Sequence, residues 1–293
     1  MEKPVRFYSE FTAMVGVLFM PDNLPKGEKR PGIVLCHGFT AVKEVLLPDI
    51  ARKLAQNGYI ALTFDYRFLG GSGGEPRRQI LPMRQIEDIR SAVTFMQHQP
   101  EVVSDRIGLL GVSLGGANVS YAAGVEDRVK ATVSVCGIGD CGRWIRDACH
   151  FWEWRALQQR LAEDRQKRVM EGQLTYIHAK DIVPEPESTT HLFEQILHQY
   201  PQWSREITLA SGEALLGYRP ESVVQDISPR AIMWLHGDAD ERVSMEESIS
   251  MYKKAEEPKK LVILPGLGHS DLISGPGLEQ SFPHIRAWFA EYL

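Results

Sequence analysis

Short apolar runs alternate with amphipathic stretches along most of the chain. Runs whose apolar side chains are continuous, or fall at every second position, predict strands. These strands are expected at residues 5–9, 13–20, 33–36, 59–66, 106–112, 129–136, 231–235 and 261–264. Stretches with apolar residues along one helical face predict helices at 45–57, 80–99, 113–124, 244–255 and 278–293. Strands that alternate with crossover helices form a parallel sheet covered on both faces, so the predicted fold class is α/β.

The alternation stops between residues 139 and 218. This interval contains helical patterns at 151–170 and 189–200, and no strand is predicted in it. We therefore predict a body made of residues 1–138 and 219–293, with a helical cap of residues 139–218 inserted after the sixth strand of the sheet.

The charge balance excludes some classes of partner. The chain has 33 Lys and Arg against 38 Asp and Glu, a net charge of −5, so no basic surface is available to attract nucleic acid or an anionic membrane. No apolar run approaches the roughly 18 to 20 residues that span a bilayer, and no signal peptide is recognised at the N-terminus. The four cysteines lack the paired spacing of a zinc site. We expect a cytoplasmic protein without metal or cofactor.

One serine has the sequence context of a nucleophile. Residues 111–115 read G-x-S-x-G, the pattern of a sharp strand-to-helix turn that exposes a serine hydroxyl. Residues 70–74 match the same pattern but lie in a glycine-rich loop with no helix after it. Since Ser113 follows a predicted strand and begins a predicted helix, we predict Ser113 as the nucleophile and Ser72 as a loop residue. The alternative role for Ser113 is an ordinary helix N-cap.

A serine nucleophile needs a base, and the base needs a carboxylate that fixes its tautomer. In this type of sheet the order along the chain is serine, acid, histidine, each after a strand. His269 follows the last predicted strand in a glycine-containing loop, which makes it the predicted base. Three carboxylates compete for the role of acid, namely Asp240, Asp238 and Asp140.

Taken together, these motifs resemble those of the α/β-hydrolase superfamily, and within it the dienelactone-hydrolase-like and cinnamoyl-esterase-like serine hydrolases. The residues that carry the resemblance are His37-Gly38-Phe39, Lys43-Glu44, Asp65-Tyr66-Arg67, residues 111–115, residues 236–240 and Gly268-His269. The resemblance implies an eight-stranded, mostly parallel sheet and favours Asp240 as the acid. Because dienelactone hydrolases use a cysteine nucleophile, Ser113 argues against that particular reaction.

Two backbone amides are expected to stabilise the oxyanion of the reaction. The N–H of Leu114 is the first donor, since it lies at the start of the helix after the nucleophile. The resemblance implies the N–H of Phe39, in the loop after the third strand, as the second. We assign His37 and His236 structural roles in their loops.

The predicted cap is rich in tryptophan, with four of the six tryptophans of the chain, at positions 144, 152, 154 and 203. They either pack the cap onto the body or line an apolar substrate pocket. Trp144 and Trp152 are the predicted pocket residues.

These observations predict a serine hydrolase that cleaves a small-molecule carboxylic ester through an acyl-enzyme, with an apolar or aromatic acyl or alcohol group. The same triad serves thioesterases, lactonases and acyltransferases, and residues 71–77 are similar to those of proteins that release or transfer polyketide acyl groups. A hydrolase-like ligand-binding protein without turnover is the alternative from another class. The oligomeric state stays open, a homodimer being one option.

Overall fold

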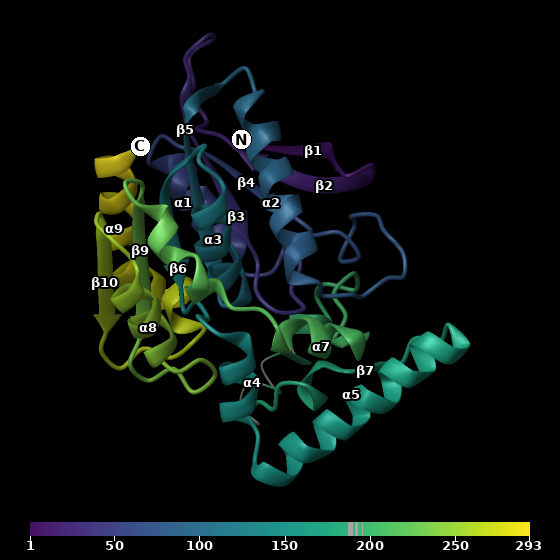
Figure 1. Ribbon diagram of the computed structural model, residues 1–293. Helices are drawn as coiled ribbons and strands as arrows, with labels where there is room; N and C mark the ends of the chain where they lie inside the picture. The colour runs from purple at the N-terminus through teal and green to yellow at the C-terminus, as the bar shows by residue number, and fades with distance from the viewer. Residues whose placement is uncertain (187–189, 191–192, 195) are drawn as a thin grey trace.

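The computed structural model describes residues 1–186, 190, 193–194 and 196–293. Its centre is an eight-stranded sheet in the order β1-β2-β4-β3-β5-β6-β9-β10 (Figure 1). The strands are β1 (Glu2–Ser9), β2 (Thr12–Phe19), β3 (Arg30–Cys36), β4 (Ile60–Phe64), β5 (Val102–Val112), β6 (Val129–Val135), β9 (Ala231–Gly237) and β10 (Lys259–Leu264). β1 pairs antiparallel with β2, and β2 with β4, whereas all other neighbours are parallel. The predicted strands and the α/β fold class are thereby confirmed.

Helices cover both faces of the sheet. The helices of the body are α1 (Leu47–Gln56), α2 (Pro82–Gln97), α3 (Leu114–Val125), α8 (Glu246–Lys254) and α9 (Gly275–Tyr292), with short 3₁₀ turns η2 (Pro220–Ser222), η3 (Val224–Ile227) and η4 (Asp271–Ile273). The apolar residues of α1 and α9 share one buried cluster with the sheet, and those of α2 and α3 belong to the clusters on the other face. α1 buries one apolar stripe, as its sequence pattern predicts, whereas nine of the twelve residues of α3 are buried.

The central strands have the composition expected of a sheet that is buried on both faces. Every residue of β4 is buried, and so is the run from Ile107 to Val112 at the end of β5. Strands without a polar face need covering layers on both sides, which the crossover helices supply. The carboxyl ends of β5, β9 and β10 therefore meet at one edge of the sheet, where the loops carrying Ser113, Asp240 and His269 begin.

The interval between β6 and β9 holds α4 (Cys141–Ala148), α5 (Phe151–Glu171), η1 (Ala179–Asp181) and α7 (Ala210–Leu216). These elements gather at one end of the sheet, and α5 extends away from the body (Figure 1). The expected absence of strands here is wrong, because β7 (Tyr176–His178) pairs antiparallel with β8 (Glu206–Thr208). Three residues are too few to show an alternating pattern. The predicted helix at 189–200 lies partly outside the described residues.

No helix in the described ranges is both long enough and apolar enough to cross a membrane. The division into a body and a cap at residues 138 and 219 stays a prediction.

Candidate active site

Ser113 lies on a sharp turn between β5 and α3. The strand ends at Val112 and the helix begins at Leu114, so a single residue makes the turn. Its backbone has φ 59° and ψ −122°, a conformation that a residue with a Cβ rarely adopts, and its N–H donates to the Val135 carbonyl at 2.9 Å. Although Ser113 holds the N-cap position of α3, its side chain makes no capping hydrogen bond. The strained turn therefore presents the hydroxyl without using it to cap the helix.

The glycines on either side of Ser113 are required by close backbone approach. A Cβ on Gly111 would lie 2.0 Å from the carbonyl oxygen of Gly115. A Cβ on Gly115 would in turn lie 2.2 Å from the carbonyl oxygen of Cys36, at the end of β3. The G-x-S-x-G pattern therefore reflects the packing of α3 against the loop after β3. The glycine-flanked Ser72 is different, since its buried hydroxyl donates to the Asp65 carbonyl at 2.6 Å and holds a loop.

Asp240 and His269 form a hydrogen-bonded pair. The Nδ1 of His269 lies 2.7 Å from Oδ2 of Asp240. The other oxygen, Oδ1, accepts the backbone N–H groups of Arg242 at 2.8 Å and Val243 at 2.9 Å. His236 adds a further contact, with Nε2 at 3.2 Å from Oδ2. The carboxylate is therefore fixed on both oxygens, and the orientation of the His269 ring is fixed with it.

These partners shift the pKa values of the pair. The Asp240 carboxyl is largely buried, yet its hydrogen bonds to His236 and His269 hold its pKa far below the usual range. Burial lowers the pKa of His269, and the attraction of Asp240 only partly opposes this effect. At neutral pH the pair is thus an ionised carboxylate beside a neutral imidazole, the charge state that a general base requires.

Ser113 and His269 line the same cavity of about 50 Å³. The Ser113 hydroxyl makes no hydrogen bond to any described residue, so the two side chains share the cavity without a hydrogen bond between them. Such contacts commonly tighten when a substrate binds. The structure therefore brings together the three side chains predicted as nucleophile, base and acid.

The two expected oxyanion donors are available. Within the described part of the chain, neither the N–H of Phe39 nor that of Leu114 has a hydrogen-bond acceptor. A Cβ on Gly38 would lie 3.2 Å from the Cβ of Ser113, which places the loop of Phe39 directly against the nucleophile. Phe39 also lines the cavity, and its ring packs edge-on against Trp144 with centroids 6.0 Å apart.

The competing carboxylates and the other histidines have structural partners. Asp238 accepts the backbone N–H of Gly266 at 2.6 Å and so holds the turn after β10. Asp140 caps α4 by accepting the N–H of Arg143 at 3.0 Å. His236 lies between Ser248 Oγ at 2.7 Å and the Val243 carbonyl at 2.9 Å. His37 packs edge-on against Tyr66 with ring centroids 4.6 Å apart, although it also lines the cavity.

The pocket prediction needs correction. Trp152 is 67% exposed at the start of α5, where it stacks on His150, and it lies outside the cavity of Ser113. Trp144 is buried but lines a neighbouring cavity, and its indole N–H donates to the Arg242 carbonyl at 2.8 Å. A tryptophan count shows that aromatic residues gather in this interval, but it carries no information on which way each one faces.

Besides Phe39, the aromatic side chains that line the cavity are Phe193 and Trp203, and Arg242 is the charged side chain of its described lining. Trp203 was among the tryptophans of the predicted cap, whereas Phe193 had no sequence signal. Arg242 lies two residues after Asp240, which is the one sequence feature that would have drawn attention to it.

Cys136 lies close to the acid–base pair. Its thiol and polar atoms of Asp240 and His269 all lie within 4.8 Å of one another, an arrangement that could hold a metal ion. Burial and the neighbouring Asp240 charge raise the pKa of the Cys136 thiol well above its usual value, which keeps it protonated. Because Nδ1 of His269 is already hydrogen-bonded to Asp240, the cluster of Cys136, Asp240 and His269 is better suited to proton transfer than to metal binding.

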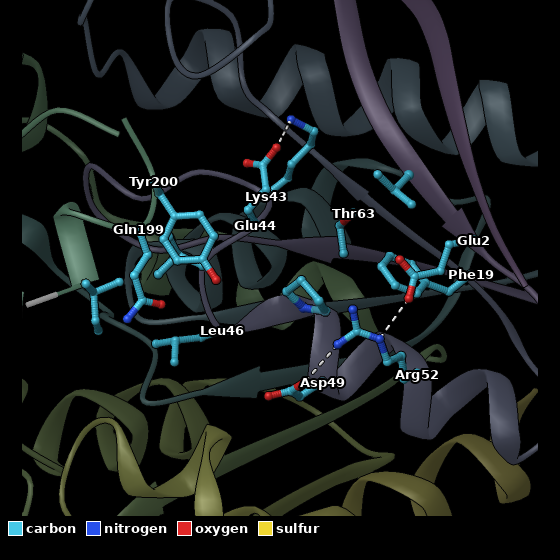
Figure 2. Close-up of a pocket in the computed structure, with 14 residues that line it drawn as sticks. Glu2, Phe19, Lys43, Glu44, Leu46, Asp49, Arg52, Thr63, Gln199 and Tyr200 are labelled. Atoms are coloured by element: carbon cyan, nitrogen blue, oxygen red, sulfur yellow. Dashed lines mark hydrogen bonds and ion pairs between the residues drawn. The ribbon is translucent and has the colours of Figure 1, made fainter. Parts of the chain in front are cut away.

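A second cavity, of about 410 Å³, lies beside α1 (Figure 2). It shares Val45 and Leu46 with the wall of the Ser113 cavity. Its charged side chains are largely paired among themselves, as Lys43 is with Glu44 and Arg52 is with Asp49 and Glu2 (Figure 2). Because the charged side chains of its described lining are held in these ion pairs, and because it contains neither Ser113 nor His269, we do not assign this cavity to the chemistry.

Comparison with known proteins finds relatives that are similar to this chain over most of its length. A polyketide transferase from a Penicillium species, grgF, is 28% identical over 271 residues, covering 91% of this chain and 90% of the relative. The thiohydrolase aneE of Aspergillus aculeatus is 28% identical, over 92% of this chain and 88% of the relative. The crystal structure of the α/β hydrolase GrgF from Penicillium superposes with a TM-score of 0.84 at 25% identity, covering 100% of this chain and 99% of GrgF.

The structure of DcsB in complex with its substrate analogue superposes with a TM-score of 0.88 at 25% identity, covering 100% of both chains. The expected α/β-hydrolase fold is therefore confirmed. Residues 14–271, which include Ser113, Asp240 and His269, match the family described as X-Pro dipeptidyl-peptidase (S15 family). The chain thus belongs to the S15 family of α/β hydrolases.

Proposed function

We propose that the protein is a serine hydrolase that cleaves carboxylic esters through an acyl-enzyme. The observation that carries the proposal is the 2.7 Å hydrogen bond between Asp240 and His269, with His269 and Ser113 lining one cavity. A strained nucleophile turn and two free backbone amides beside it are consistent with acyl transfer.

In this mechanism the Ser113 hydroxyl attacks the ester carbonyl and passes its proton to Nε2 of His269. Asp240 keeps the proton of His269 on Nδ1, so that Nε2 is the basic nitrogen. The N–H groups of Phe39 and Leu114 receive the negative charge of the tetrahedral intermediate. His269 then returns the proton to the leaving alcohol, and a water molecule repeats the sequence to release the acid.

Thioester cleavage, or transfer of the acyl group to another acceptor, is the second candidate. The names of two relatives favour it, since one is a polyketide transferase and another a thiohydrolase. The acyl-enzyme is common to these reactions, which differ in the leaving group and in the acceptor that attacks it. Matched oxygen esters and thioesters of one acyl group, each tested with water and with an added alcohol, distinguish the reactions.

X-Pro dipeptides are poor candidates as substrates despite the family name. A dipeptidyl-peptidase must hold the positively charged amino end of its substrate. The described lining of the cavity contains no carboxylate, and its charged side chain is Arg242. We therefore expect turnover of an X-Pro anilide to be far slower than that of an ester.

Labelling with a fluorophosphonate probe tests the proposed nucleophile. We expect the wild-type protein to be labelled and the Ser113→Ala variant to be unlabelled. Ser72→Ala is the matched control, since Ser72 lies in the second G-x-S-x-G sequence, and it should retain labelling. Absence of labelling in the wild type, together with retained ligand binding, would favour a hydrolase-like binding protein instead.

A further inference from the structure

Arg242 belongs to the loop that carries the proposed acid. Its backbone N–H donates to Oδ1 of Asp240 at 2.8 Å, and its carbonyl accepts the indole N–H of Trp144 at 2.8 Å. With its backbone fixed from both sides, the residue directs its side chain to the wall of the cavity that Ser113 and His269 also line. A positive charge is therefore held at a fixed position in the proposed active site.

The guanidinium of Arg242 is desolvated but has unused hydrogen-bond donors. The side chain is only 14% exposed, and its Cζ lies 4.7 Å from the ring centroid of Phe193. It makes no hydrogen bond to any residue that the structure describes. A largely buried guanidinium whose donors have no described protein acceptor is a suitable partner for a bound group that supplies acceptors.

Arg242 and Arg205 lie close to one shared carboxylate, and the ionised Asp240 in the same loop is held by its own hydrogen bonds to His269 and His236. Among the described residues, the carboxylate that pairs with the Arg242 guanidinium is Glu185, whose Oε2 lies 3.7 Å from Nη2. That same oxygen already accepts Nη2 of Arg205 at 2.7 Å. Two arginines thus share one carboxylate. Burial lowers the pKa of Arg242 to about 10, a value that still leaves the guanidinium protonated at neutral pH.

We propose that Arg242 binds an acceptor oxygen on the acyl part of the substrate, so that the preferred acyl chain carries a carboxylate or a 3-keto group. This inference rests on the proposed acyl hydrolase function and specifies its substrate class. The planar guanidinium offers paired donors that match two oxygens. The Phe193 ring covers one side of the guanidinium, with its centroid 4.7 Å from Cζ, and supplies no hydrogen-bond acceptor there other than its π face.

The test compares three N-acetylcysteamine thioesters with five-carbon acyl groups, namely glutaryl, 3-oxopentanoyl and neutral valeryl. We expect the wild type to prefer glutaryl or 3-oxopentanoyl over valeryl by about 10- to 100-fold in kcat/KM, the effect of a charged hydrogen bond. The difference should lie mainly in KM. Whether glutaryl or 3-oxopentanoyl thioester is preferred over valeryl thioester shows whether Arg242 binds a carboxylate or a keto oxygen.

Three variants connect the preference to Arg242. Arg242→Gln should bring the ratio of either oxygen-bearing thioester to valeryl close to one. Arg242→Lys keeps the charge but not the paired donors, and should retain an intermediate ratio. Arg165→Gln is the control, because Arg165 lies on exposed α5 and pairs with Glu213, and its ratio should equal that of the wild type. Circular dichroism verifies that each variant is folded.

Two results overturn the inference while the proposed function stands. The first is a wild-type protein that hydrolyses valeryl thioester, is labelled at Ser113 and shows no preference for either oxygen-bearing acyl group. The second is a preference that survives in Arg242→Gln. A wild type that neither turns over any of the three thioesters nor reacts with a fluorophosphonate would overturn both proposals.

Discussion

Trp144 and Arg242 are joined by a hydrogen bond from the indole N–H to the main-chain carbonyl over 2.8 Å. The bond connects α4 to the loop that positions Asp240, and the Trp144 ring also packs against Phe39 of the oxyanion loop. A residue outside the cavity thereby contacts both the loop of the proposed acid and the loop of a proposed oxyanion donor.

Replacing Trp144 by Phe should therefore weaken both stability and activity. The lost hydrogen bond leaves a partly buried carbonyl without its partner, which costs about 1 kcal/mol in unfolding free energy. We expect kcat to fall and KM to rise, because the displaced loop carries both Asp240 and Arg242, whose side chain lines the cavity. Trp152→Phe, at an exposed position, should leave both quantities unchanged in denaturant titrations and steady-state assays.

Asp240→Asn tests the assignment of the acid. An amide in place of the carboxylate favours the wrong tautomer of His269, a change that lowers kcat by about 10⁴-fold in the well-studied serine protease case. Asp238→Asn, by comparison, alters only a hydrogen bond to the turn after β10 and should reduce kcat by only a few-fold. A larger loss in the Asp238 variant than in the Asp240 variant would reverse the assignment.

The pH dependence of kcat/KM reports the protonation of His269. The imidazole must be neutral to accept the Ser113 proton, and burial lowers the pKa of His269 below its usual value of about 6.5. Activity should therefore rise with pH through a midpoint below 6.5 and be level above pH 7. A midpoint above 6.5, or a flat profile from pH 4.5 to 8, would contradict a buried histidine base.

Gly115→Ala should destabilise the fold strongly. The added Cβ would lie 2.2 Å from the carbonyl oxygen of Cys36 and 2.6 Å from that of His37, and backbone atoms cannot move aside cheaply. We expect a loss of about 3 kcal/mol in unfolding free energy, at the upper end for overpacking. Gly172→Ala at the end of α5 provides the comparison, since nothing lies within 4 Å of the Cβ that the substitution adds. Only the positive φ of residue 172 is then unfavourable, at a cost of about 1 kcal/mol in unfolding free energy. Thermal denaturation of both variants measures the difference.

The elements and the nucleophile turn could be predicted from sequence because their signals are local. Continuous apolar runs mark β4 and β5 as buried strands, and the glycines around Ser113 record close contacts of a single turn. The position of His269 after the last strand follows from the order of elements. These features depend on spacing along the chain, which the sequence displays directly.

The cavity wall could not be predicted because it is made by contacts between distant segments. Trp203 bonds Thr40 across 163 positions, with Nε1 and Oγ1 3.4 Å apart, and Phe193 stacks on both Arg205 and Arg242. No periodicity distinguishes these aromatic residues from Trp152, which faces solvent. The two short strands β7 and β8 were not predicted for the same reason, because each is defined by its hydrogen bonds to the other strand and not by a local sequence pattern.

The Ser113 cavity is assembled from two sources. The reacting groups come from loops of the central sheet, whereas Phe193 and Trp203 come from the interval between β6 and β9. Substitutions in that interval can reshape the wall without moving a strand that precedes a residue of the proposed triad. Under the proposed function, selection can retune acyl preference in small steps while the reacting groups stay unchanged, and laboratory evolution for new acyl groups should begin with these aromatic positions.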